Sequence, residues 1–182
     1  MNAFSPLRMA VGIAFILALA VSPLRRLLEA DMRSHMLIQF PAILVAGALI
    51  YSSLPDQLRT RTARWNFLGL SGLTYLAVVL AVVMVPRVLD LAAVDARVEA
   101  FKFSALATAG AVLGPSWKAA GTVIQAFFIG TVLPMMIAVA SIYTDVSIRL
   151  CNSYGLDEQQ KLGYELMVIA VLAGVCWLSN TM

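Results

Sequence analysis

Histidine, cysteine and charged residues are scarce in this sequence of 182 residues. It has one histidine, His35, two cysteines, and 13% charged residues. One imidazole excludes a bis-histidine haem site or a multi-histidine catalytic metal centre built from this chain alone. Cys151 and Cys176 lie far apart and form no C-x-x-C pair, so they indicate neither a zinc site nor a disulfide.

Motifs of soluble enzymes are also absent. The sequence has no P-loop, no G-x-G-x-x-G, no H-E-x-x-H and no nucleophile elbow, and we therefore expect no independent catalysis. The net charge of +3 and the pI near 9.1 do not indicate nucleic-acid binding. In an apolar chain, basic residues flank membrane spans and contact lipid phosphates, so the expected partner is the bilayer.

Apolar residues dominate the chain: 61% are hydrophobic and the mean hydropathy is +0.87, against about 45–50% apolar residues in soluble proteins. Short polar breaks separate apolar segments near residues 7–24, 35–54, 66–86, 101–114, 118–144 and 162–179. A helix needs about 20 residues to cross a bilayer. The sequence predicts an all-α, polytopic transmembrane bundle of about six spans, forming one domain over residues 1–182.

Three segments have features that affect the number and type of helices. Residues 7–24 could pass for a signal peptide, but they end in S-P-L-R-R without a small-x-small cleavage site, which favours a retained span. Residues 101–114 are short and run into Gly114-Pro115, where a helix should break or kink, so five spans is the alternative. The stretch RVLDLAAVDARVEAFK predicts a short interfacial helix.

The stretch EADMRSHMLIQFP contains the histidine. On a helix, Met32, His35, Met36 and Gln39 share one stripe, with Asp31 one turn earlier. Thioethers and an imidazole are soft ligands that suit Cu(I), which makes Met32, His35 and Met36 a candidate copper site. The same letters also predict an ordinary helix start capped by Asp31 or Ser34, with methionines as core fillers.

The run LALAVSPLRRLLEADMRSHMLIQFPAILVAG resembles the early part of the CtaG-like family, membrane proteins linked to copper delivery and cytochrome c oxidase assembly. In that family an SPL turn precedes a helix opening with His-Met-x-x-His. Three later stretches are similar in order: VEAFKFSALATAG to a second His-x-x-x-His helix, GTVLPMMIAVASIYTDVS to the end of a later span, and YGLDEQQKLGYELMVIAVLAG to a D-x-Q-x-x-G opening.

This chain departs from the family pattern at three of four histidine positions. His35 is kept, but Gln39 stands at the second position, and Glu99 and Phe103 stand in the second motif. The family also usually has more spans. The resemblance therefore implies copper handling through His35 alone, and chemistry suggests Met32, Met36 and Glu99 as substitute ligands.

Polar residues inside the spans have simpler explanations. Glu165 stands four residues after Lys161, which favours an ion pair over a proton relay. Gln125 should hydrogen-bond across helices. Pro41 and Pro134 should kink their helices.

The leading hypothesis is a non-catalytic accessory or assembly protein, resembling CtaG-like factors, that handles Cu(I) for a copper-containing membrane oxidase in the bacterial inner membrane. The alternative is a structural subunit of a larger respiratory or monooxygenase-type complex, without a metal of its own. A small transporter, suggested by Pro41, Pro134 and Glu165, ranks third. The sequence leaves the partner enzyme, the sidedness and the oligomeric state open.

Overall fold

The computed structural model describes residues 5–145, 150–151 and 153–181. The last two letters of GTVLPMMIAVASIYTDVS, at 146 and 147, lie outside this part of the chain. Within it, all regular structure is helical, which confirms the predicted all-α class. The elements are α1 (Pro6–Ala20), α2 (Ser22–Glu29), η1 (Ser34–Gln39), α3 (Phe40–Ser52), α4 (Asp56–Trp65), η2 (Phe67–Gly69), α5 (Leu70–Val83), α6 (Pro86–Val94), α7 (Ala96–Ala119), α8 (Thr122–Asp145) and α9 (Leu156–Thr181).

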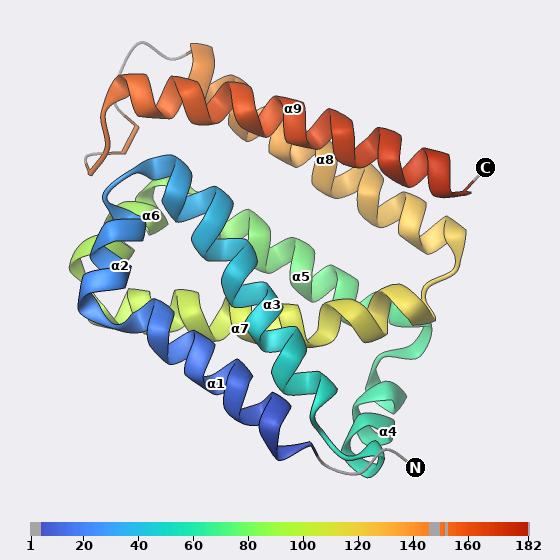
Figure 1. Cartoon of the computed structure of the whole chain (residues 1–182). Helices are drawn as coiled ribbons and strands as arrows, with labels where there is room; N and C mark the ends of the chain where they lie inside the picture. The colour runs from blue at the N-terminus through green and yellow to red at the C-terminus, as the bar shows by residue number, and fades with distance from the viewer. Residues whose placement is uncertain (1–4, 146–149, 152, 182) are drawn as a thin grey trace.

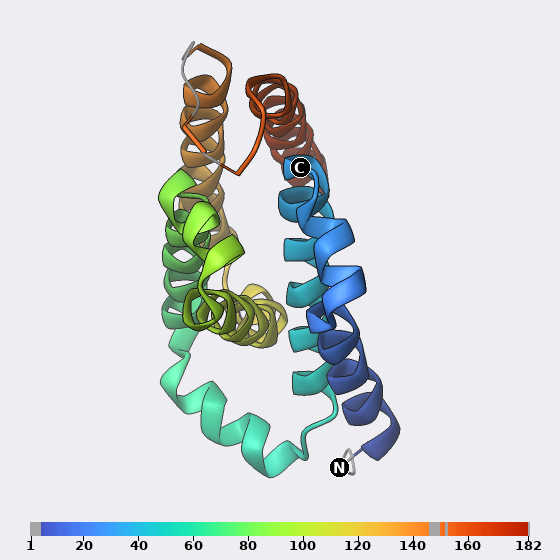
Figure 2. The ribbon, with the colours of Figure 1, turned by 90° about the vertical axis from the view of Figure 1, so that its left-hand side faces the viewer.

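The long helices α8 and α9 lie side by side, and α3 crosses α7 obliquely (Figure 1). Helix α7 packs between α3 and α5, α1 packs on α3, and α8 pairs with α9. Figure 2 shows α3 and α5 on opposite sides of α7, with α4 joining the two sides at one end. Short helices α2 and α6 lie at the other end of the bundle, where α6 contacts Cys151 and Ser153.

Three helical segments are long and apolar enough to cross a bilayer: Ser34–Ser53, Thr122–Asp145 and Leu156–Thr181. Two bent pairs, α1 with α2 at 66° and α4 with η2–α5 at 64°, raise the number to five if each pair is one span. These helices make the chain an integral membrane protein. The expected six spans exceed this range, and α7 is not among the candidate spans: it combines many small, weakly apolar residues with four charged ones, Arg97, Glu99, Lys102 and Lys118.

The structure differs from the predicted segments at two places. The segment 7–24 is not one helix, because the chain bends at Val21, where Ser22-Pro23 starts α2. Conversely, α7 continues through Gly114-Pro115, where we expected a break. The Ser116 hydroxyl donates to the carbonyl of Val112 at 2.5 Å, beside the position where proline lacks an N–H. Such side-chain bonds help proline to sit inside helices in membranes.

The short helix predicted between the third and fourth segments is present as α6, which ends at Val94. The Asp95 side chain then accepts a hydrogen bond from the Arg97 amide at 2.7 Å and caps α7. As a result, Glu99 and Lys102 belong to the first turns of the long helix and face the bundle interior, where both are buried.

Helices α3 and α7 touch through glycine. A Cβ atom on Gly110 would lie 2.0 Å from the Leu44 carbonyl oxygen, and one on Gly47 would lie 1.9 Å from that of Ala107. Small residues at such crossings let helix backbones approach closely in membranes. This close crossing brings the start of α7 against η1, and it therefore positions the polar groups described next.

Candidate functional site

The segment around His35 begins with a cap and continues as a π-helix. The Asp31 carboxylate accepts hydrogen bonds from the Ser34 amide and hydroxyl, both at 3.3 Å, which confirms Asp31 as a cap. Residues Ser34–Gln39 then form η1, a π-helical turn, a rare geometry often found at functional sites. Its residues His35 and Gln39 both contact one side chain of α7.

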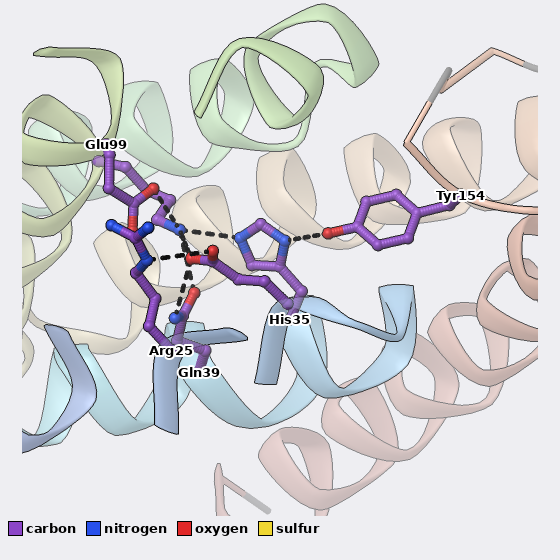
Figure 3. A network of polar contacts seen from close by, with 7 residues as sticks. Arg25, His35, Gln39, Glu99 and Tyr154 are labelled. Atoms are coloured by element: carbon purple, nitrogen blue, oxygen red, sulfur yellow. Dashed lines mark hydrogen bonds and ion pairs between the residues drawn. The ribbon is translucent and has the colours of Figure 1, made fainter. Parts of the chain in front are cut away.

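That side chain is Lys102, which is only 1% exposed and lies at the centre of a polar network (Figure 3). Its ammonium donates hydrogen bonds to His35 Nε2 at 2.9 Å, Gln39 Oε1 at 3.0 Å and Glu29 Oε1 at 3.0 Å. Glu99 Oε2 lies 2.9 Å from the same Nζ atom. The network joins α2, η1 and α7, which are far apart in the sequence.

Further groups surround this centre. Glu29 Oε1 also accepts a hydrogen bond from Gln39 Nε2 at 3.2 Å, and Glu29 Oε2 lies 3.6 Å from Arg25 Nε. The Phe40 and Phe103 rings lie 6.0 and 5.3 Å from Lys102 Nζ, within reach of cation–π attraction. A buried ammonium is therefore held by carboxylates, an amide, an imidazole and aromatic rings.

The hydrogen bonds assign the protonation of His35. Lysine donates and cannot accept, so Nε2 is the acceptor and the neutral ring carries its proton on Nδ1. Nδ1 lies 2.6 Å from the Tyr154 hydroxyl, which comes from the segment before α9. Burial raises the pKa of Tyr154 above its usual value, so this hydroxyl is uncharged. Both ring nitrogens are thus engaged, and His35 is fully buried.

The predicted ligands of a copper site all lie inside the bundle. Met32, His35 and Met36 are 0%, 0% and 4% exposed, and both methionines belong to the apolar core. His35 Nε2 faces an ammonium, which repels a metal ion, and Nδ1 faces Tyr154. The present arrangement does not fit a Cu(I) ion on His35. Among the residues that the structure describes, no group of three or more His, Cys, Asp and Glu side chains is placed to hold a metal.

Other residues singled out in the sequence have local partners. Glu165 pairs with Arg33 across helices, with Arg33 Nε donating at 2.8 Å, and the expected pair with Lys161 is wrong. The prediction for Gln125 is confirmed, since it accepts from Trp177 of α9 at 3.3 Å and donates to the Trp117 carbonyl.

Both cysteines are free, Cys151 buried and Cys176 exposed. Burial raises the pKa of the Cys151 thiol to about 12, so the reactive thiolate is scarce at neutral pH.

Sequence reasoning missed Lys102 and Tyr154. One signal for Lys102 was available. A lysine three residues after Glu99, at the start of an apolar segment, is expensive in a membrane unless it is paired. No comparable signal marks Tyr154, whose partner His35 is more than a hundred residues away.

Comparisons with known proteins return no match: no family model, no curated protein sequence and no solved structure is similar to this chain. What the fold and the site define is a class, a helical integral membrane protein with a buried network of ionisable groups centred on Lys102.

Proposed function

We propose that this chain is a non-catalytic accessory or assembly protein of a larger membrane complex in the bacterial inner membrane. The observation that carries the proposal is the Lys102 network. Its groups bond to one another and join three helices, so their chemistry is used to hold the bundle together. We assign the chain no reaction of its own, and we place it beside a copper-containing oxidase or a monooxygenase-type enzyme, as the resemblance to CtaG-like proteins implies.

The arrangement of the family-matching positions supports this proposal. His35, Gln39, Glu99 and Phe103 stand where the resembling family has histidines, and all four surround the Lys102 ammonium. An ammonium among them supplies a positive charge without a metal. We therefore favour an accessory subunit whose network carries no copper. Cu(I) hand-over by Met32, His35 and Met36 is the competing version, and it requires His35 to leave both of its present partners.

The α8–α9 hairpin gives the chain an outward apolar surface. Only 11% of the apolar window of α8 and 22% of that of α9 are buried inside the bundle, compared with 39% for Ser34–Ser53. One stripe of α9, formed by Val168, Leu172 and Val175, is more than half exposed at each residue. Lipid or partner helices cover such a face, and a partner helix there would be the contact of an accessory subunit.

Gentle solubilisation of the tagged protein from its native membrane tests this function. We expect a stoichiometric partner enzyme to co-purify, and alanine at Val168, Leu172 and Val175 to reduce its recovery several-fold. Alanine at Leu7 and Val11, two exposed apolar positions of α1 outside the α8–α9 hairpin, serves as the matched control. Purification as a monomer at every detergent concentration would contradict the proposal.

A further inference from the structure

The Lys102 ammonium has more acceptors around it than it has hydrogens. Four acceptor atoms lie within 3.0 Å of Nζ, on Glu29, His35, Gln39 and Glu99. An ammonium group has three N–H bonds. Lys102 Nζ makes hydrogen bonds to Glu29, His35 and Gln39. Glu99 Oε2 lies 2.9 Å from Nζ, but this contact lacks hydrogen-bond geometry.

Glu99 is therefore the group left without a donor. Its side chain is 8% exposed, and both carboxyl oxygens are shielded from solvent with no hydrogen-bond partner. A buried carboxylate that accepts no hydrogen bond is unfavourable, whereas a carboxylic acid needs less solvation and has a proton to donate. Glu29 is the neighbouring acceptor, because its Oε1 and Glu99 Oε2 lie 3.0 and 2.9 Å from the same Lys102 Nζ atom.

The charges of the network also favour one proton on the carboxyl pair. Lys102 is the one fully buried cation among the described residues of the network, and two carboxyl groups, 11% and 8% exposed, face it. Arg25 lies farther away, is one third exposed, and its Nε makes no hydrogen bond. One proton on the carboxyl pair would make the buried groups neutral.

We propose that Glu99 and Glu29 bind one exchangeable proton, carried by Glu99 and donated to Glu29, which makes the network a proton-binding site. Its ligand is the proton itself, and its release leaves a second negative charge beside Lys102. Arg25 pairs with Glu29 at 3.6 Å and its side chain is one third exposed, so we infer that the proton exchanges with solvent at the α2 end of the bundle. The site does not depend on the accessory function and can be tested on the purified protein alone.

The groups facing this pair come from a few elements. Lys102 lies on the helix of Glu99, Arg25 on the helix of Glu29, and His35 on the far side of Lys102. Tyr154 reaches His35, and α6 places Asp90 near the same segment, where it accepts from the Ser153 amide. Helices α3 and α5 also pack on α7 but carry no charged side chain.

Infrared spectroscopy of the purified protein, with glutamate selectively labelled with carbon-13, tests the proposal. The chain has only four glutamates, Glu29, Glu99, Glu158 and Glu165. We expect a carboxylic-acid carbonyl band at neutral pH that shifts with the label and in heavy water and is lost as the pH is raised. Glu99→Gln should remove the band, and Glu165→Gln, which removes a carboxyl group paired with Arg33, should retain it.

A folded Glu99→Gln protein with an unchanged band would overturn the assignment. So would the absence of any labelled carboxylic-acid band at neutral pH in the unsubstituted protein. Should Glu99→Gln fail to fold, the labelled unsubstituted protein decides alone: the band at neutral pH supports a protonated buried pair, and its absence contradicts it.

Discussion

Lys102→Met lowers the free energy of unfolding by about 3–5 kcal/mol at neutral pH, because it removes one partner of a buried ion-pair network. Methionine fills a similar volume but leaves Glu29 and Glu99 facing each other without the cation. It also removes the donors to His35 Nε2 and Gln39 Oε1. Since proteins are stable by only about 5–15 kcal/mol, we expect much of the protein to be lost on purification. Unfolding by denaturing detergent, followed by circular dichroism, measures the change.

Two further variants make the result specific to the network. Lys118→Met makes the same change on the same helix at an exposed position, and we expect little effect on stability. Adding Glu99→Gln to Lys102→Met should restore part of the loss, because a neutral amide replaces one of the two carboxyl groups left without the cation. Equal stability of Lys102→Met and Lys118→Met would show that the buried ammonium does not hold the bundle.

Gly110→Val should separate α3 from α7. The first added carbon would lie 2.0 Å from the Leu44 carbonyl oxygen and 2.6 Å from the Leu44 Cα atom, both backbone atoms that no rotamer change can move away. Overpacking costs about 1–3 kcal/mol in ordinary cores, and a backbone clash places this variant at or above the upper end. We expect lower stability and a disturbed Lys102 network, measured by thermal unfolding in detergent.

Gly114→Val is the matched control, since this glycine lies one turn further along α7 with nothing within 4 Å of an added Cβ atom. It should fold normally. A Gly110→Val protein as stable as Gly114→Val would mean that α3 and α7 do not cross closely at Leu44.

The helical segments could be predicted from apolar run length, whereas the bends could not. The turn at Val21 agrees with the S-P-L signal, although we expected residues 7–24 to form one span, whereas the continuity through Pro115 runs against the Gly-Pro signal. The Ser116 hydroxyl next to Pro115 bonds to the Val112 carbonyl and helps α7 to continue as one helix. The packing of α7 between α3 and α5 also favours an unbroken helix. Counting apolar segments gave six spans, above the three to five that the helices allow, because that count included the segment that forms α7, which is rich in small residues and buries two charged ones, Glu99 and Lys102.

Half of the network could be anticipated. His35, Gln39 and Glu99 were identified from their positions in a family pattern, and Asp31 from capping chemistry. The convergence of these residues on Lys102 could not be predicted from the sequence, because it depends on how α2, η1 and α7 pack. Residues 29, 35 and 102 are far apart in the sequence and share no local pattern. The stripe of Met32, His35 and Met36 is equally compatible with metal binding and with core packing until the partners of the imidazole are known.

The account depends most on the state of the His35 imidazole, and because the chain has a single histidine, nitrogen-15 NMR of histidine-labelled protein observes this ring alone. We predict one fixed neutral tautomer at neutral pH, protonated at Nδ1 and bare at Nε2, with signals unchanged by added Cu(I). A ring that averages between tautomers, or whose nitrogen signals shift when Cu(I) is added, would contradict the Lys102 network and favour the copper-handling version.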